Sequence, residues 1–216
     1  MNHMPNAAID PLFDRIADAL VEQGYIICDQ AIDVPLTEAL HQRIRQLDAE
    51  AFQRAGVGRE QDQHLNDRVR RDAIRWLERG DTAEAAYLAW MERLREGLNR
   101  RLFMGLFDYE CHFAHYAPGA FYQRHVDAFR GQTNRILTTV FYLNPDWQPD
   151  DGGELLIYPD QGDCVPERVA PRAGRLVVFL SDRFPHEVLP ARVDRYSIAG
   201  WFRVNASIGN QIDPPR

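Results

Sequence analysis

The 216-residue sequence predicts an α+β fold: a double-stranded β-helix of the jelly-roll or cupin-like type, with N-terminal helices packed on one sheet. Two observations lead to this prediction. Residues 1–107 read mainly as helices, because apolar residues recur at intervals of three and four. Over residues 108–205, short β-rich runs alternate with turn signals, as in sandwiches and barrels. We expect one domain, 1–216, since a chain of this length can close a single core.

The first helix is predicted near the start of the sequence. Asp10 is a typical N-cap residue, Pro11 suits the first helical position, and Gly24 ends the apolar pattern. A short strand is expected immediately afterwards, at residues 25–28. The second helix is expected over about residues 35–54.

The third helix is predicted to begin near Asp81, with Glu84 as its partner in a capping box. Its apolar residues have the spacing of a buried helix face, and we interpret them as core: Tyr87, Met91, Leu94, Leu98 and Leu102. Before it, the polar segment 56–70 carries two glycines and is expected to be a functional loop. A strand at 72–77 is expected to follow that loop.

The second half of the sequence contains further β-rich runs. Pro-Gly, Asp-Gly-Gly, Gln-Gly-Asp and Ala-Gly turns separate them. The predicted strands cover residues 109–116, 135–144, 154–158, 164–170, 175–181 and 195–204.

The composition argues against several classes of protein. The 25 basic and 32 acidic residues give a net charge of −7, which does not favour bulk binding to nucleic acid. No apolar run reaches the roughly 18 residues that a membrane span needs, and the N-terminus lacks a signal-peptide pattern. The cysteines Cys28, Cys111 and Cys164 are far apart and odd in number, so we expect free thiols. These features predict a cytoplasmic protein.

The triplet His125-Val126-Asp127 is the first candidate for a functional site. In an extended backbone, residues two apart point to the same side, so an imidazole and a carboxylate converge. His186, further along the sequence, supplies a third candidate ligand. Two histidines and one carboxylate on one face of an octahedron leave three positions open, an arrangement typical of non-haem iron(II) oxygenases. A His-x-Asp triplet alone also matches many solvated turns, so it needs independent support.

Arg195 supplies that support. It follows His186 closely and opens a predicted strand that can return its side chain toward the metal. A planar guanidinium pairs with a carboxylate through two parallel hydrogen bonds. A dicarboxylate such as 2-oxoglutarate, which chelates iron at one end, needs such a partner at its other end. We therefore interpret Arg195 as the anchor of a 2-oxoglutarate cosubstrate.

Five stretches together resemble a known family. They occur in order over residues 116–203: YAPGAFYQRHVD, RILTTVFYLNPDW, GGELLIYP, RLVVFLSDRFPHEVLP and RYSIAGWFR. They resemble the 2-oxoglutarate-dependent prolyl hydroxylases, particularly the hypoxia-inducible-factor type and its bacterial relatives. The resemblance continues weakly upstream through RRDAIRWLE. It implies an iron(II)/2-oxoglutarate dioxygenase domain whose catalytic β-core is 108–205.

The resemblance also implies roles for individual residues. The iron ligands correspond to His125, Asp127 and His186, and the residue that binds the distal carboxylate of 2-oxoglutarate corresponds to Arg195. The other correspondences are Tyr142, a second partner of that carboxylate; Tyr116, near metal and cosubstrate; Trp201 and Leu155, which wall the pocket; and Arg135, at the substrate entrance. The segment 56–70 corresponds to a mobile finger loop that folds over a bound peptide.

The residue pattern supports part of this correspondence. Tyr142 shares a strand face with Val140 and Thr138, and that face could line a pocket. Its ring tolerates burial while its hydroxyl remains polar, although an ordinary barrel core would also accept it. Ser197 shares the face of Arg195 and could add a hydrogen bond to the cosubstrate.

Two features depart from the family pattern or lie outside it. Asp127 is followed by Ala-Phe where the animal enzymes have Asn-Pro, so the loop 128–134 leaves substrate choice open. Those enzymes also tend to have a small apolar residue in place of Ser197. His112 and His115 point to opposite faces of a strand, and we interpret both as structural.

The activity that the resemblance implies is hydroxylation at C4 of a prolyl residue in an intracellular protein. Iron(II), 2-oxoglutarate and dioxygen are its cofactor and cosubstrates, with ascorbate as a supporting reductant and succinate and carbon dioxide as products. The finger loop and Arg135 favour a peptidyl substrate over a free amino acid. The resemblance to the oxygen-sensing enzymes points to a proline in an intracellular protein. If the source is bacterial, elongation factor Tu is the first candidate, on family grounds.

Three alternatives remain open at this point. The same enzyme class could act on a free amino acid or small metabolite. A cupin-like metal-binding module without turnover is a second alternative, but it predicts a broken triad or a missing arginine. The third is a dioxygenase that uses the triad without 2-oxoglutarate, and the pair Arg195 and Tyr142 argues against it.

Overall fold

The computed structural model describes residues 10–55, 69–128, 134–159 and 165–205. Its elements, in chain order, are α1 (Pro11–Glu22), β1 (Tyr25–Cys28), α2 (Val34–Gln46), η1 (Ala49–Ala51), β2 (Gln53–Arg54), β3 (Ala73–Trp76), α3 (Thr82–Leu102), β4 (Leu106–Tyr116), β5 (Tyr122–His125), β6 (Arg135–Tyr142), η3 (Pro149–Asp151), β7 (Leu155–Ile157), β8 (Glu167–Val169), β9 (Leu176–Leu180), β10 (His186–Val188) and β11 (Arg195–Val204).

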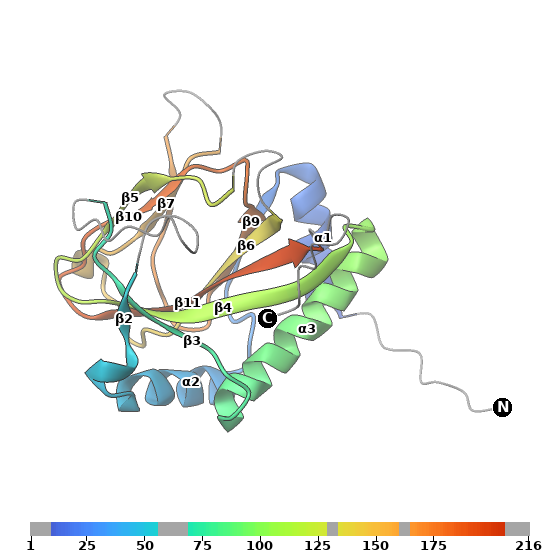
Figure 1. The fold of residues 1–216 in the computed structure, drawn as a ribbon. Helices are drawn as coiled ribbons and strands as arrows, with labels where there is room; N and C mark the ends of the chain where they lie inside the picture. The colour runs from blue at the N-terminus through green and yellow to red at the C-terminus, as the bar shows by residue number, and fades with distance from the viewer. Residues whose placement is uncertain (1–9, 56–68, 129–133, 160–164, 206–216) are drawn as a thin grey trace, which may run out of the picture.

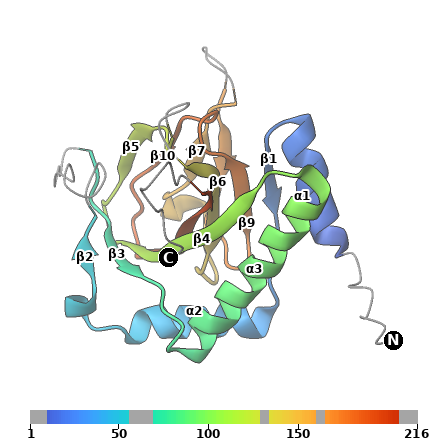
Figure 2. The same cartoon turned by 45° about the vertical axis from the view of Figure 1, so that its right-hand side comes forward.

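Two antiparallel sheets form the double-stranded β-helix. The large sheet has the strand order β1-β9-β6-β11-β4-β3-β2, and the small sheet has the order β5-β10-β7-β8. In Figures 1 and 2, the helices α1, α2 and α3 lie on one side of the large sheet, and β5, β7 and β10 lie on the other. The predicted fold class, an α+β chain with helices packed on one sheet of a double-stranded β-helix, is confirmed.

The alternation of side chains along the large sheet creates two separate apolar clusters. On β6, Leu137 and Phe141 join the buried side chains of the helices, whereas Val140 and Tyr142 pack against the small sheet. This follows from the period of two along a strand. The inner cluster contains Ala114, Tyr116, Ala120, Val140, Tyr142, Leu155, Ile157, Val169, Val177, Phe179, Phe184 and Val188. The space between the sheets is therefore where pocket residues must be sought.

The ends of the first two helices test the sequence prediction. The Asp10 side chain accepts a hydrogen bond from the Leu12 amide at 3.0 Å, so the predicted cap and start of α1 are confirmed. The prediction that the second helix reaches residue 54 is wrong, because α2 ends at Gln46. The chain turns extended at Leu47, and β2 pairs with β3 at the edge of the large sheet. Tertiary pairing here overrides helix propensity.

The predicted capping box of α3 is half correct. Asp81 caps the helix by accepting from the amides of Ala83 and Glu84, at 2.9 and 3.1 Å. The Glu84 side chain does not return to the cap. It is buried and accepts from Arg43 Nε at 2.9 Å, from the Glu78 amide at 2.8 Å and from Arg75. Glu84 thereby ties α2, β3 and α3 together as a paired buried charge.

The predicted strands of the second half recur at nearly their expected positions, as β4, β6, β7, β8, β9 and β11. The strands β2, β5 and β10 are absent from the prediction. They have two, four and three residues, too few positions for a period-2 pattern to be visible. This matters for function, because β5 and β10 carry the candidate ligands.

Two smaller expectations can also be compared with the structure. Cys28 and Cys111 are free and buried, as expected, and Cys164 lies outside the described residues. Among the described helices, none combines the length and the apolar character that crossing a membrane requires.

Gly200 on β11 is packed too tightly to accept a side chain. A Cβ at this position would overlap the Tyr109 hydroxyl and lie 2.7 Å from Cys111 Cβ. Tyr109 cannot move easily, because its hydroxyl bonds Thr139 Oγ1 at 2.8 Å. Gly200→Ala is therefore expected to lower the free energy of unfolding by about 1–3 kcal/mol, the usual cost of overpacking, as measured by urea denaturation. Gly80→Ala is the control, since a Cβ there meets nothing within 4 Å; equal losses in both variants would contradict the packing argument.

Candidate metal and cosubstrate site

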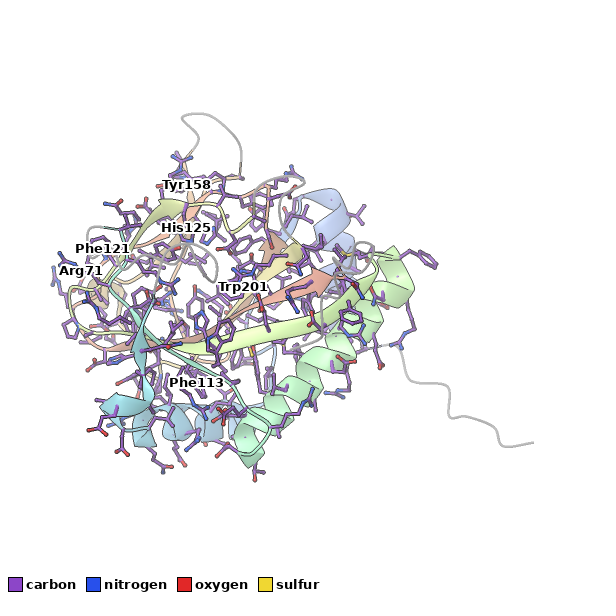
Figure 3. All side chains as sticks on the ribbon, in the orientation of Figure 1. Arg71, Phe113, Phe121, His125, Tyr158 and Trp201 are labelled. Carbon is purple, nitrogen blue, oxygen red and sulfur yellow. The ribbon has the colours of Figure 1, made fainter. Side chains whose placement is uncertain are left out.

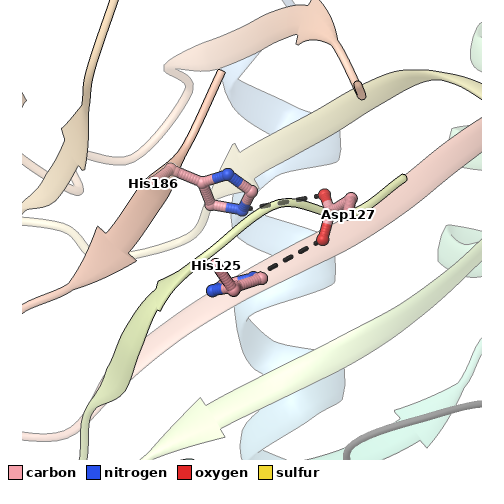
Figure 4. A group of neighbouring side chains, drawn as sticks. All are labelled: His125, Asp127 and His186. Carbon is pink, nitrogen blue, oxygen red and sulfur yellow. Dashed lines mark ion pairs between the residues drawn. The ribbon is translucent and has the colours of Figure 1, made fainter. Parts of the chain in front are cut away.

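The two sheets bring His125, Asp127 and His186 together between them. His125 ends β5 and His186 begins β10, and the two are register partners in the small sheet. Asp127 follows β5 by two residues. One ligand atom from each of the three residues lies within 4.8 Å of the others, and Figure 4 shows the carboxylate facing both rings. Nε2 of His125 lies 3.5 Å from Asp127 Oδ1, and Nε2 of His186 lies 3.7 Å from Oδ2.

Backbone carbonyls orient both imidazoles. Nδ1 of His125 lies 2.7 Å from the Gln123 carbonyl oxygen, and Nδ1 of His186 lies 3.0 Å from that of Phe184. A carbonyl only accepts, so each Nδ1 carries the proton and each Nε2 offers its lone pair toward Asp127. Burial lowers the pKa of His186 to about 4, which keeps the ring in the neutral form that a metal ion binds.

The carboxylate of Asp127 is held on one side by two donors. Its Oδ2 accepts from Thr138 Oγ1 at 2.7 Å and from Trp201 Nε1 at 3.1 Å. Burial disfavours the charged form of this carboxylate, but His186 and His125 in their protonated forms, together with the hydrogen bond from Thr138, outweigh it and lower the pKa of Asp127. With both lone pairs of Oδ2 occupied, Oδ1 is the oxygen available to a metal ion. Two imidazoles and one carboxylate oxygen fit an iron(II) ion with open positions.

Tyr122 stacks on His125, a contact that strand alternation does not predict. The ring centroids are 3.6 Å apart with an interplanar angle of 17°. Residues three apart on a regular strand point to opposite sides, but β5 has a register shift here: His186 pairs with His125 while Val188 pairs with Tyr122. The extra residue of this bulge returns Tyr122 to the side of His125. A bulge of this kind leaves no clear signal in the sequence.

Arg195 lies deep in the large sheet, at the start of β11. It is 1% exposed, and its Nε donates to the Gly153 carbonyl at 2.8 Å. Ser197 Oγ lies 3.4 Å from the guanidinium, and the rings of Tyr116 and Tyr142 lie 4.9 and 5.1 Å from its central carbon. No acidic side chain of the described residues forms an ion pair with it, although a buried cation needs a negative partner.

Tyr142 provides a second sign of a missing partner. Its hydroxyl oxygen is buried and has no hydrogen-bond partner among the described atoms. Burial raises the pKa of Tyr142, so the hydroxyl stays protonated and able to donate. A buried cation and a buried unused donor beside it fit one carboxylate group, as 2-oxoglutarate would supply.

Gly153 allows this geometry, because its backbone has φ +68° and a Cβ there would lie 2.8 Å from Ala191 Cβ and 3.2 Å from Arg195 Cδ. Only glycine adopts such a backbone at low cost while its carbonyl approaches the guanidinium.

The other predicted site residues fall into two groups. Leu155 lies in the inner apolar cluster together with Tyr116 and Tyr142, the two rings that contact Arg195. Trp201 belongs to the second group, at the end of the site where its indole N–H donates to Asp127. Arg135 is also at that end, where it pairs with Glu110 and stacks on Trp201.

Most of the predicted finger loop, 56–68, and most of the loop 128–134 lie outside the described residues. The residues that leave the finger loop are placed: Val69 and Arg70 pair with β5 beside the triad. The Arg70 guanidinium lies 4.6 Å from the ring of Tyr122 and bonds Asp72. Figure 3 shows the next pair, Arg71 and Phe121, at the same edge of the molecule.

A double-stranded β-helix with a His-Asp-His triad and a buried arginine defines the class of 2-oxoglutarate/iron(II) oxygenases. The family model of the 2OG-Fe(II) oxygenase superfamily matches residues 111–203. The chain is 30% identical to human prolyl hydroxylase EGLN3 over 205 residues, which cover 88% of this chain and 82% of that protein. The chain thus belongs to the prolyl hydroxylase family of these oxygenases.

Further relatives agree with this family. The hypoxia-inducible factor prolyl hydroxylase of Caenorhabditis elegans is 42% identical over 86 residues, which are 39% of this chain and only 12% of that longer protein. A solved Pseudomonas putida prolyl-4-hydroxylase has 43% identity and a TM-score of 0.81, covering 89% of this chain and 100% of its own. A prolyl hydroxylase in complex with a hypoxia inducible factor peptide fragment, from Trichoplax adhaerens, has 28% identity and a TM-score of 0.78, covering 89% of each chain.

His112 and His115 occupy opposite faces of β4, as predicted. His115 bonds Asp194 at 2.6 Å and stacks on Tyr196. His112 is buried beside the rings of Trp76 and Trp201. Neither belongs to the metal-ligand group found among the described residues.

Burial lowers the pKa of His112 to about 4, which predicts a pH-dependent stability. A histidine in an unfolded chain has a pKa of about 6.5. Between this pH and pH 4, His112 binds a proton in the unfolded chain but stays neutral in the folded protein. The stability is thus present above pH 6.5 and lost as the pH falls toward 4. At pH 5 the loss is expected to be about 2 kcal/mol, from 1.36 kcal/mol per pH unit. Urea unfolding of the metal-free protein and of His112→Gln at pH 7.5 and 5 measures it; the same pH dependence in both proteins would contradict the assignment.

Proposed function

We propose that this chain is an iron(II)- and 2-oxoglutarate-dependent dioxygenase that hydroxylates a prolyl residue of a protein at C4. The observation that carries the proposal is the presence, between the two sheets, of a His-Asp-His triad and a buried arginine without an acidic partner among the described residues. A metal-binding triad alone would be compatible with many reactions. The second feature selects those that use a dicarboxylate cosubstrate.

The triad residues hold the metal ion in this proposal. His125 and His186 ligate through Nε2, because their Nδ1 atoms face backbone carbonyls. Asp127 ligates through Oδ1, since Thr138 and Trp201 occupy Oδ2. Three protein ligands leave room for the cosubstrate and for dioxygen. With iron bound, one dioxygen and one 2-oxoglutarate convert a C–H bond to C–OH and give succinate and carbon dioxide.

The deep end of the pocket binds the cosubstrate. Arg195 pairs with its distal carboxylate, and Tyr142 donates to the same group. Ser197 lies close enough to the guanidinium to hold it or to add a bond to the carboxylate. Tyr116 and Leu155 wall this end and keep water out, which strengthens the ion pair.

A peptidyl proline is favoured as the substrate on two grounds. The relatives are named as prolyl hydroxylases, and one of them is solved with a bound peptide fragment. Val69 and Arg70, the first described residues after segment 56–68, pair with β5 next to the triad, so the chain re-enters the described fold beside the candidate metal ligands. Elongation factor Tu is the first protein to test, given the likeness to a bacterial enzyme. A cytoplasmic location would suit such a substrate.

Replacing Arg195 tests the cosubstrate site. Arg195→Met removes the buried charge at similar length and should weaken 2-oxoglutarate binding roughly 10- to 100-fold, the range for a charge-assisted hydrogen bond of about 1.5–3 kcal/mol. Anaerobic titration with manganese(II) in place of iron measures the Kd without turnover. The control is Arg168→Met, which loses an exposed ion pair with Glu154 on the small sheet. A Kd unchanged in Arg195→Met would remove the proposed anchor.

The substrate proposal is tested by mass spectrometry. Incubation of elongation factor Tu and of proline-containing peptides with enzyme, iron(II), 2-oxoglutarate and ascorbate should add one oxygen atom to a proline. Asp127→Ala is the control for iron-dependent side reactions, and it should give no product because it lacks a metal ligand. Oxygen added to free proline or another small molecule, but to no peptide, would support the small-metabolite alternative. Succinate formation equal to that of the unmodified enzyme in Asp127→Ala would overturn the proposed metal site.

A further inference from the structure

We infer that Arg135 is a positioning residue, held by Glu110, that acts through the indole of Trp201 on the metal-binding carboxylate of Asp127. The inference deepens the proposed function and rests on it, since it assigns residues that tune the same metal site. It replaces the predicted role of Arg135 as a basic residue at the substrate entrance.

Trp201 is the junction of this arrangement. It lies in the middle of β11, opposite Glu110 on β4 and opposite Thr138 on β6. Thr138 donates to Asp127 Oδ2, and so does the indole N–H of Trp201. One cross-strand neighbour of Trp201 therefore bonds the same oxygen as the indole, and the other neighbour holds Arg135.

Arg135 is fixed from two directions. Its guanidinium carbon lies 3.7 Å from the centre of the Trp201 ring system. Its Nε and Nη2 donate to Glu110 Oε1 at 2.9 and 2.8 Å. Glu110 is itself buried, and Arg203 Nε approaches its second oxygen at 3.8 Å while pairing with Asp108. Glu110 compensates the charge of Arg135, and the guanidinium stacks on the indole. Arg135 is therefore placed to fix the orientation of the Trp201 ring rather than to contact a substrate.

The stacked cation has two consequences for Asp127. It fixes the indole plane, so the N–H points at Oδ2 in one orientation. It also draws electron density toward the ring face, which makes the N–H a stronger donor. A firmly held Oδ2 keeps the carboxylate from turning to chelate the metal with both oxygens. The positions needed by cosubstrate and dioxygen therefore remain open.

The experiment measures metal binding rather than turnover. Cobalt(II) replaces iron as a spectroscopic probe, and its visible d–d bands report the geometry and number of its ligands. Trp201→Phe removes the N–H and keeps an aromatic ring, and it should weaken cobalt binding roughly 10-fold, the lower end for residues that support metal ligands, with altered d–d bands. Arg135→Gln should change the bands in the same sense by a smaller amount.

Two further variants distinguish positioning from general damage. Arg135→Lys keeps a cation over the indole and should restore most of the native spectrum. In the double variant Trp201→Phe/Arg135→Gln, the effect on the cobalt Kd should be no larger than that of Trp201→Phe alone, because Arg135 acts through the N–H. Additive effects would overturn the inference, and so would a native spectrum in Arg135→Gln with a raised KM for peptide.

The matched control is Arg124→Gln. Arg124 stacks on Tyr158 at the same 3.7 Å, and Tyr158 bonds Glu187, which alternates with buried His186 and Val188 and so faces outward. This variant should leave the cobalt spectrum native. Failure of the proposed function itself would look different: the unmodified protein would bind cobalt no better than His186→Ala.

Discussion

The antiparallel pairing of β11 with both β4 and β6 is the constraint on which the rest of the site depends. It places Arg195 opposite Tyr116, Ser197 opposite Tyr142, and Trp201 between Glu110 and Thr138. A slip of one residue would turn all of these side chains toward the helices. The apolar residues between them, Ile198 and Phe202, would then lose the helical layer. The hydrophobic face that packs the fold and the polar face that builds the site thus fix the same register.

The two ends of the inner wall have different electrostatic tasks. At the Arg195 end, the residues supply a cation and donors for an anion that must arrive from solution. At the Trp201 end, the residues donate hydrogen bonds to an anionic group of the protein itself, the carboxylate of Asp127. The two histidines of the triad come from the small sheet, where β5 and β10 pair, and the carboxylate of Asp127 meets the large sheet at Thr138 and Trp201. One strand, β11, therefore carries residues of both ends, Arg195 at the first and Trp201 at the second.

Much of the fold and part of the site could be predicted from the sequence. Period-2 patterns and turn residues located the long strands. The extended backbone of the triplet placed the side chains of His125 and Asp127 on one side. The features that could not be predicted depend on distant pairing. The end of α2 is set by the pairing of β2 with β3, and Glu84 serves a buried ion cluster instead of its own helix cap. Tyr122 reaches His125 only through a bulge. Each of these is decided by a partner far away in sequence, which no local pattern encodes.

The treatment of charge along the inner wall gives the strongest reason to place the cosubstrate at one end only. Two other arginines of the large sheet each have a buried acidic partner: Arg135 pairs with Glu110, and Arg203 pairs with Asp108. Arg195 is buried at least as deeply, yet no described acidic residue pairs with it. A fold that compensates two of three arginines with its own carboxylates can also compensate the third. Among the described residues, Arg195 contacts a carbonyl, a hydroxyl and two tyrosine rings but no carboxylate, which indicates that a ligand carries the missing negative charge.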